Sequence, residues 1–203
     1  VAGGFSNAGQ ACISVQRVYL HRPIFEEALA LLVDRVRALT VGDPREPGTA
    51  VGPMITGEAA GTAFAKVQDA VGKGARAITG GSCEGPLFYP TVLLDTTPDM
   101  EVNRTEVFAP VVTVTPYDTF EEAIALANDS DYGLQAGLFT HDARRIAQAF
   151  AGIRVGGLVI NDVSTFRMDH APYGGVRGSG IGREGPKYAI EEMTEERMMV
   201  FSP

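Results

Sequence analysis

The chain has 203 residues, of which 45% are hydrophobic, and its 25 acidic and 17 basic residues give a formal net charge of −8. Two cysteines are too few for a disulfide framework, which favours a reducing compartment, and an acidic chain without a basic patch is repelled by nucleic acids and anionic membranes. No apolar run reaches the roughly 20 residues that span a bilayer. We therefore expect a cytoplasmic protein that binds neither nucleic acid nor membrane.

Strand and helix patterns alternate along the chain. Short runs rich in β-branched and other apolar residues predict strands over 17–21, 75–79, 90–95, 110–117, 134–140 and 156–161. Helical spacing, a proline start and a capping box predict helices over 23–36, 57–72, 143–150 and 187–196 and from Thr119 onward. The repeated β-α order predicts an α/β fold of three layers, in which helices flank a mostly parallel sheet.

Cys12 lies in the segment NAGQACIS (7–14), among small and polar residues. A nucleophilic thiolate needs access and nearby backbone N–H donors, and a loop of small residues supplies both better than an apolar strand does. Most cysteines are structural, so the spacing alone leaves a structural thiol open as the alternative. Cys83, in the glycine-rich stretch GGSCEGP, has no chemical group around it and is interpreted as an incidental loop cysteine.

Glu106 stands in TEVFAPVV (105–112), immediately before a predicted strand. A carboxylate at the entrance of a strand can accept hydrogen bonds from two hydroxyls at once, such as those of a ribose. The alternative is a solvated loop acid, and this segment by itself favours that alternative.

The glycine-rich stretch 170–185 does not form a dinucleotide fingerprint. Its G-x-G pattern follows a loop instead of a strand and runs into Arg183 where a third glycine is required. The chain also lacks a P-loop, zinc-ligand spacing and a G-x-S-x-G elbow. Of the three histidines, only His170 lies in a loop that could approach a site. A Cys–His hydrolase therefore stays open as an alternative, although no spacing supports it.

Seven segments taken in chain order resemble the C-terminal half of the NAD(P)-dependent aldehyde dehydrogenases. They are NAGQACISVQRVYL, GPMI, PTVL, EVFAPVV, NDSDYGLQAGLFT, GGLVIND and PYGGVRGSGIGREG, and together they extend over nearly the whole chain. The resemblance implies a catalytic domain over 1–196 and a C-terminal oligomerisation strand over 197–203, without the cofactor-binding domain. It also implies NAD or NADP as cofactor, a small aldehyde as substrate and assembly into a homo-oligomer.

The resemblance further implies the role of each motif residue. Cys12 becomes the nucleophile that attacks the aldehyde carbonyl, and its backbone N–H helps to hold the oxyanion in a loop supported by Asn7 and Gln10. Glu106 binds the nicotinamide ribose. The side chains expected to border the nicotinamide are Phe108 and Leu134. The side chains expected to line the aldehyde tunnel are Arg17, Phe166, Arg167, His170 and Tyr173.

The loop NDVSTFRMDHAPY (161–173) is similar to that of family members acting on lactaldehyde, succinic semialdehyde or phosphonoacetaldehyde. Arginines near such a tunnel can pair with a carboxylate or phosphate, which predicts a small polar or anionic aldehyde; solvated loop arginines are the alternative. In this family the dinucleotide domain, the general-base glutamate and a second oxyanion donor precede the cysteine. We therefore expect the isolated chain to be inactive, and a self-associating module without catalysis is the second hypothesis.

Overall fold

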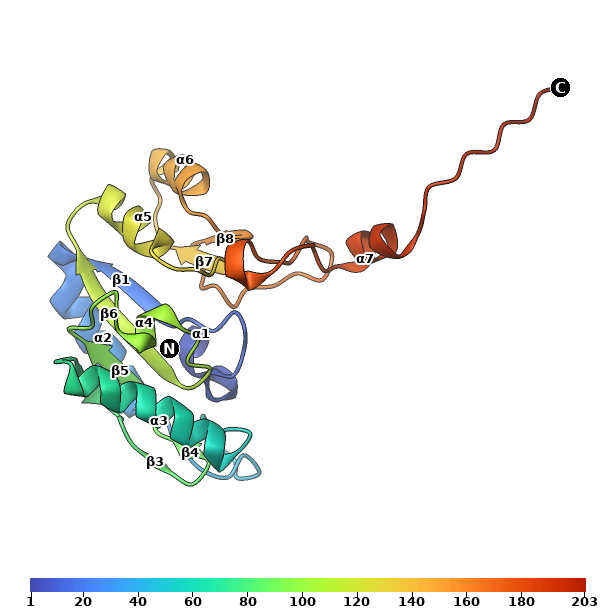
Figure 1. Ribbon diagram of the computed structural model, residues 1–203. Coiled ribbons are helices and arrows are strands. Elements are labelled where there is room, and N and C mark those ends of the chain that lie inside the picture. Colours follow the sequence, from blue (N-terminus) through green and yellow to red (C-terminus); the bar gives the residue numbers. More distant parts are fainter.

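The main sheet has four strands in the order β1-β6-β5-β2. A computed structural model describes all residues 1–203, and Figure 1 shows this sheet within a layered α/β body. The strands are β1 (Arg17–His21), β6 (Val111–Tyr117), β5 (Thr91–Leu94) and β2 (Arg76–Thr79). β1 and β5 both run parallel to β6, whereas β2 closes the edge antiparallel to β5. The predicted, mainly parallel sheet is confirmed, with one antiparallel edge strand.

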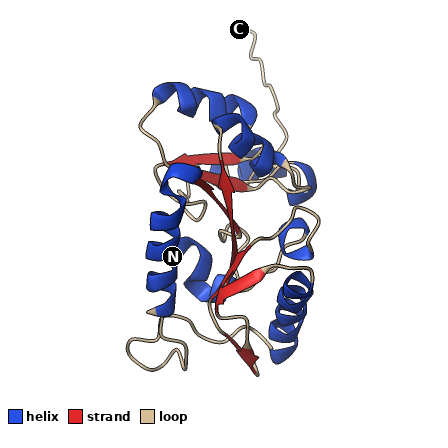
Figure 2. Ribbon diagram, turned by 90° about the vertical axis from the view of Figure 1, so that its left-hand side faces the viewer, coloured by secondary structure: helices blue, strands red, loops and turns tan.

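Helices cover both faces of this sheet. Figure 2 shows strands in the centre with helices on either side, and these are mainly α2 (Phe25–Arg37) and α3 (Gly57–Gly72). α3 buries Ala60, Ala63, Val67 and Ala70, whose spacing of three and four residues forms one narrow helix face. Small side chains on that face let the helix lie close to the layer below it. The three-layer prediction is therefore confirmed.

A second, smaller sheet stands beside the first. Its strands β7 (Gln135–Leu138) and β8 (Gly157–Ile160) pair in parallel with each other and with no strand of the main sheet. α5 (Phe120–Asn128) and α6 (Ala143–Gly152) belong to the same part of the chain. The predicted capping box starts α5, because the Thr119 hydroxyl accepts from the Glu122 amide at 3.2 Å. The sheet is thus divided, a feature that the order of elements did not predict.

Short elements complete the chain. They are α1 (Ala2–Phe5), η1 (Ser6–Gly9), η2 (Arg22–Ile24), β3 (Cys83–Glu84), β4 (Leu87–Phe88), α4 (Glu101–Arg104), η3 (Arg177–Ser179) and α7 (Pro186–Met193). The loop position inferred for Cys83 was wrong. Cys83 pairs with Phe88 in a two-stranded hairpin, and its half-buried side chain packs against the hydrophobic core.

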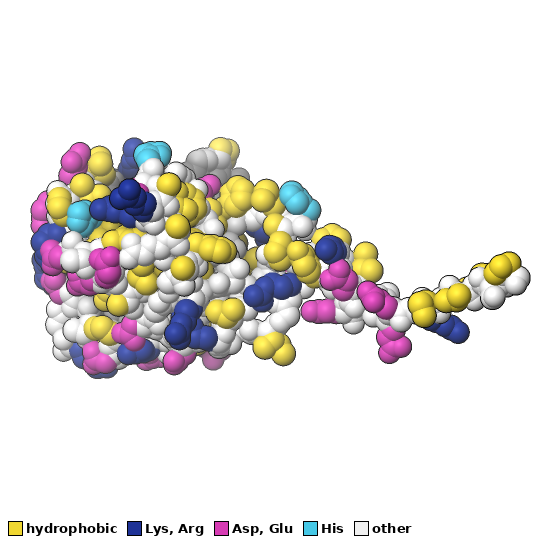
Figure 3. All heavy atoms as spheres, turned by 90° about the horizontal axis from the view of Figure 1, so that it is seen from above, with side chains coloured by type: hydrophobic (Ala, Val, Ile, Leu, Met, Phe, Trp, Pro, Cys, Tyr) yellow, Lys and Arg dark blue, Asp and Glu magenta, His cyan; other side chains and the backbone are white.

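The C-terminal arm lies apart from the body. α7 buries none of its residues, and the chain after it forms no secondary structure and extends away from the domain (Figure 1). Figure 3 shows acidic and hydrophobic side chains along this arm. The tail residue Phe201 is 88% exposed, and Met198, Met199 and Val200 are similarly open. None of the helices is both long enough and apolar enough to cross a membrane.

We propose that the tail 197–203 associates with a second copy of the chain, because its apolar side chains are buried only when they find a partner. Light scattering of the full chain beside a version ending at Glu196 tests this proposal. We expect the full chain to form larger species and the shortened one to stay monomeric. Two monodisperse monomers of equal solubility would contradict it.

Candidate active site

Cys12 follows a turn with an unusual backbone. Asn7, Ala8 and Gly9 have φ values of 52°, 54° and 68°, so three successive residues are left-handed. Such a conformation costs a non-glycine residue about 1–2 kcal/mol and persists only where the surroundings enforce it. Here the Asn7 side-chain amide donates to the Gln10 carbonyl at 2.9 Å and closes the turn. The turn leaves the Cys12 side chain exposed at its end.

The turn rests directly on the loop that carries Glu106 and Phe108. A Cβ added at Gly9 would lie 2.1 Å from the carbonyl oxygen of Ala109, so only glycine permits this approach. Gln10 connects the other side of the turn to the segment around Ile55, because its side-chain oxygen accepts a hydrogen bond from the Ile55 amide at 2.9 Å. The backbone around the cysteine is therefore fixed against two separate segments of the chain.

Gln16 holds the loop in place from the cysteine side and was missed by the sequence analysis. Its amide nitrogen donates to the carbonyls of Val102 and Thr105, both at 2.8 Å, and its oxygen accepts from the Val107 amide at 3.0 Å. A glutamine ahead of an apolar strand gave no signal for this role, because its partners lie about 90 residues away. One side chain thereby satisfies three backbone groups of the loop before β6.

Glu106 and Phe108 both face solvent in this loop. The Glu106 carboxylate is exposed and makes no hydrogen bond or ion pair. The main-chain carbonyl of Glu106 accepts a hydrogen bond from the Lys66 ammonium at 2.9 Å. Phe108 is 43% exposed and has a left-handed φ of 52°. Ala109, the next residue, is outside the left-handed region and buried. A free carboxylate beside an open aromatic ring suits a ligand that carries paired hydroxyls and a flat ring.

Tyr173 is the one side chain that hydrogen-bonds Cys12. Its phenol oxygen lies 2.8 Å from the Cys12 sulfur, although the residue stands 161 positions away in the sequence. Tyr173 is only 8% exposed, and its backbone is paired with Glu184 by two hydrogen bonds. Burial, followed by the contact with Cys12, raises the pKa of Tyr173 well above its usual range. The phenol therefore keeps its proton at neutral pH. No histidine contacts Cys12, so the hydrolase alternative has no support.

A cavity of about 310 Å³ opens beside this pair. The side chains that define it are Cys12, Leu134, Tyr173, Ile181, Arg183 and Glu184. The structure thus places Leu134 in the same cavity lining as Cys12, and it adds Arg183 and Glu184, which the sequence analysis did not assign. Arg183 donates to the Gly175 carbonyl at 2.9 Å, which fixes the wall of the cavity.

Arg167 approaches the pair from its outer side. Its guanidinium carbon lies 4.2 Å from the centre of the Tyr173 ring, and its nitrogen pairs with a Glu184 oxygen at 3.2 Å. Phe166 and His170, from the same segment, are exposed and make no side-chain contact with the cysteine. Of the loop residues expected to line a tunnel, Tyr173 therefore contacts Cys12, and Arg167 contacts Tyr173.

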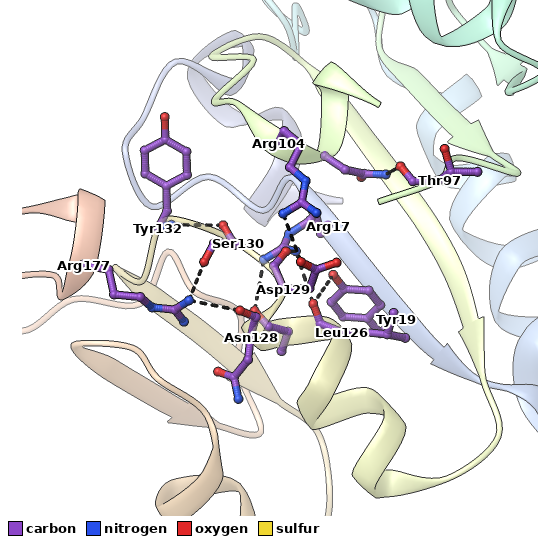
Figure 4. A network of polar contacts seen from close by, with 12 residues as sticks. Arg17, Tyr19, Thr97, Arg104, Leu126, Asn128, Asp129, Ser130, Tyr132 and Arg177 are labelled. Carbon is purple, nitrogen blue, oxygen red and sulfur yellow. Dashed lines mark hydrogen bonds and ion pairs between the residues drawn. The ribbon is translucent and has the colours of Figure 1, made fainter. Parts of the chain in front are cut away.

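The expectation that Arg17 lines the tunnel was wrong. Arg17 lies on β1, and its guanidinium donates to the carbonyls of Leu126, Ala127 and Asp129 at 2.9–3.3 Å, where α5 ends (Figure 4). A cation at a helix C-terminus satisfies free carbonyls and complements the helix dipole. Arg177 reaches the same turn from the glycine-rich loop (Figure 4). Arg17 therefore joins the two sheets instead of contacting a substrate.

Comparison with known proteins relates this scaffold to oxidoreductases. Residues 1–199 match the model of the aldehyde dehydrogenase family, and the chain belongs to that family. It is 50% identical over 198 residues to the 3-sulfolactaldehyde dehydrogenase of Priestia aryabhattai. This alignment covers 98% of this chain and 42% of that protein. The chain thus spans less than half the length of this relative.

Two solved structures are also similar. Aldehyde dehydrogenase 21 from Physcomitrella patens, in complex with its reaction product succinate, has a TM-score of 0.94 at 41% identity and covers 96% of this chain and 40% of its own. Glyceraldehyde-3-phosphate dehydrogenase from Methanocaldococcus jannaschii, complexed with NADP, has a TM-score of 0.91 at 40% identity, with coverage of 95% and 42%. The fold described above is therefore that of an aldehyde dehydrogenase domain.

The contact between Gly9 and Ala109 predicts a strong effect of a single methyl group. Gly9→Ala adds a Cβ against a backbone carbonyl in a left-handed conformation, so it should lower the free energy of unfolding by about 3 kcal/mol or more. Urea denaturation measures this change. Gly61→Ala is the control, because Gly61 lies inside α3 with no atom near its Cβ, and the alanine should raise stability by up to ~1 kcal/mol. Equal effects would contradict the prediction.

Proposed function

We propose that the chain is the catalytic domain of an aldehyde dehydrogenase in which Cys12 is the nucleophile. The observation that carries this proposal is the placement of Cys12. The cysteine is exposed at the end of a strained turn, hydrogen-bonded to a buried phenol and packed next to a loop with an unpaired carboxylate. Strain of this kind accumulates at functional sites, and a structural thiol has no need of it.

The chemistry proceeds through the sulfur of Cys12. The thiolate adds to the aldehyde carbon, so that a C–S bond forms and the carbonyl electrons move to oxygen. Backbone N–H groups of the turn hold the resulting oxyanion, as donors of this type do in acyl chemistry. Bound NAD or NADP supplies the acceptor for the hydride that this thiohemiacetal loses. Water then hydrolyses the thioester on Cys12, which releases the carboxylic acid and restores the thiolate.

Three residues would hold the nicotinamide end of the cofactor. The unpaired Glu106 carboxylate would accept from the two ribose hydroxyls, while Phe108 and Leu134 would border the ring. The relative solved with NADP supports this use of a dinucleotide. Since these contacts concern only one end of the molecule, we propose that the isolated chain binds NAD(P) weakly and does not turn over aldehydes.

We propose a small anionic aldehyde as the substrate. Arg167 stacks on Tyr173, the residue that contacts the cysteine, and its only ionic partner, Glu184, lines the cavity at Cys12, so an incoming anion can compete for the guanidinium. Relatives with names such as 3-sulfolactaldehyde dehydrogenase and sulfoacetaldehyde dehydrogenase support this class. The parent enzyme would act in the cytoplasm as a homo-oligomer.

A self-associating module without catalysis is the second candidate function. The exposed apolar tail favours it, because α7 and the tail make so few contacts with the domain. The two functions are compatible, since the tail 197–203 does not line the cavity at the cysteine.

Alkylation tests the assignment of Cys12. In the folded chain, iodoacetamide at neutral pH should label Cys12 faster than Cys83, because Cys83 is half-buried in a hairpin. Mass-spectrometric mapping over time measures both rates. In urea the two cysteines should react at similar rates, which controls for the sequence around each thiol. Labelling of Cys83 first in the folded chain, or protection of Cys12 from labelling, would refute the assignment of Cys12 as the nucleophile.

The charge of the alkylating agent tests the substrate class. Arg167→Gln should lower the ratio of the iodoacetate rate to the iodoacetamide rate at Cys12 by about threefold, because a nearby cation attracts the anionic reagent. The ratio cancels any change in thiol ionisation. Arg144→Gln, on α6 and exposed, should leave the ratio unchanged. An unaltered ratio in the Arg167 variant would argue against an anionic substrate.

A further inference from the structure

We propose that Tyr173 is a positioning residue that donates a hydrogen bond to the Cys12 thiolate and stabilises it in its resting place. The inference rests on the proposed function, in which Cys12 is the attacking group. It is carried by the 2.8 Å contact between the phenol oxygen and the sulfur. Phenylalanine, which lacks the hydroxyl, has no atom that could make this contact.

The direction of the hydrogen bond follows from the acidities of the two groups. Burial and the adjacent sulfur raise the pKa of Tyr173, so its proton stays on the phenol and the phenol oxygen is the donor in this contact. An O–H donor facing a thiolate forms a charge-assisted hydrogen bond, which is stronger than one between neutral groups. The contact therefore favours the charged form of sulfur over the neutral form.

Tyr173 cannot easily move away from this position. Its backbone donates to the Glu184 carbonyl at 3.1 Å and accepts from the Glu184 amide at 2.6 Å. Arg167 covers one face of its ring, and a cation over the ring withdraws electron density and makes the phenol a better donor. The same Arg167 is held by the Glu184 carboxylate at 3.2 Å. Backbone pairing and stacking thus fix the hydroxyl at the sulfur.

The surrounding charges do not replace this hydrogen bond. Arg167, Arg183, Glu184 and Glu192 are the ionic groups around the pair, and their two positive and two negative charges offset one another. The turn before Cys12 carries no charged side chain. The Tyr173 hydroxyl is therefore the one direct donor from a side chain to the sulfur.

This arrangement has a specific kinetic signature. Stabilising a thiolate increases its population at low pH but makes each thiolate less nucleophilic, with a Brønsted slope of about 0.4–0.5. Tyr173→Phe should shift the midpoint of the pH–rate profile for Cys12 alkylation upward by about one unit. The variant should then react about threefold more slowly than the parent at low pH and about threefold faster on the high-pH plateau. A variant with only a structural defect would not produce a pH–rate profile that crosses the profile of the parent.

The experiment measures iodoacetamide alkylation of the full chain from pH 5 to 10, with Cys12 and Cys83 quantified separately. Tyr132→Phe is the matched control, because Tyr132 is 43% exposed and its hydroxyl makes no hydrogen bond, and its profile should match that of the parent. Arg167→Gln should shift the midpoint in the same direction by a smaller amount. The Cys83 rate reports whether each variant is folded.

The outcomes separate this proposal from the proposed function. If Cys12 of the parent chain reacts no faster than Cys83, the nucleophile assignment fails, and this inference fails with it. If Cys12 is selectively labelled but the Tyr173→Phe profile superimposes on the parent profile, or is slower by one factor at every pH with Cys83 unchanged, only the hydrogen-bond proposal is overturned. Crossing curves support it.

Discussion

The approach of the Gly9 backbone to the Ala109 carbonyl is the constraint on which the site depends. It holds the turn before Cys12 against the loop before β6, and these two segments carry the Cys12 thiol and the unpaired Glu106 carboxylate. β1 and β6 pair in parallel just beyond both segments, so the sheet brings their starting ends to the same edge. Glycine is needed because any side chain would collide with the carbonyl and push the two segments apart.

The turn that ends α5 is a second point at which distant segments of the chain are held together. Arg17 from β1, Arg104 from α4 and Arg177 from the glycine-rich loop all donate to groups of residues 126–130 (Figure 4). The two sheets share no strand ladder, so these side chains connect them in place of one. The glycine-rich loop held by Arg177 follows Tyr173 closely in the chain. Cation binding at a helix C-terminus thus helps to set the wall that faces the cysteine.

The site combines a fixed cysteine side with an open loop before β6. On the cysteine side three polar groups have partners: the Asn7 side chain donates to the Gln10 carbonyl, the Cys12 thiol contacts Tyr173, and Arg167 pairs with Glu184. In the loop before β6 the side chains of Glu106 and Phe108 are exposed, and the Glu106 carboxylate has no partner. Fixed groups suit the atoms that react in every turnover, whereas unpaired groups suit a ligand that must bind and leave.

The sequence by itself determined the elements and the family resemblance. Apolar periodicity and the Thr119 cap placed the strands and helices within a few residues, and the motifs around Cys12 and Glu106 identified both segments, because these signals are local. The resemblance also suggested Arg17 as a tunnel residue, but its guanidinium binds the carbonyls at the end of α5. Neighbouring side chains on a strand point to opposite faces, so a position at the start of β1 does not by itself fix the direction of this side chain.

Only the tertiary structure decided which side chains meet. The contact between Tyr173 and Cys12 spans 161 positions, and Gln16 reaches groups about 90 residues away. It also decided that β7 and β8 form a sheet separate from the main one and that Cys83 joins a hairpin. Local patterns record the period of an element and the chemistry of a residue. They do not predict which distant segment contacts a residue, because the packing of the whole chain determines that contact.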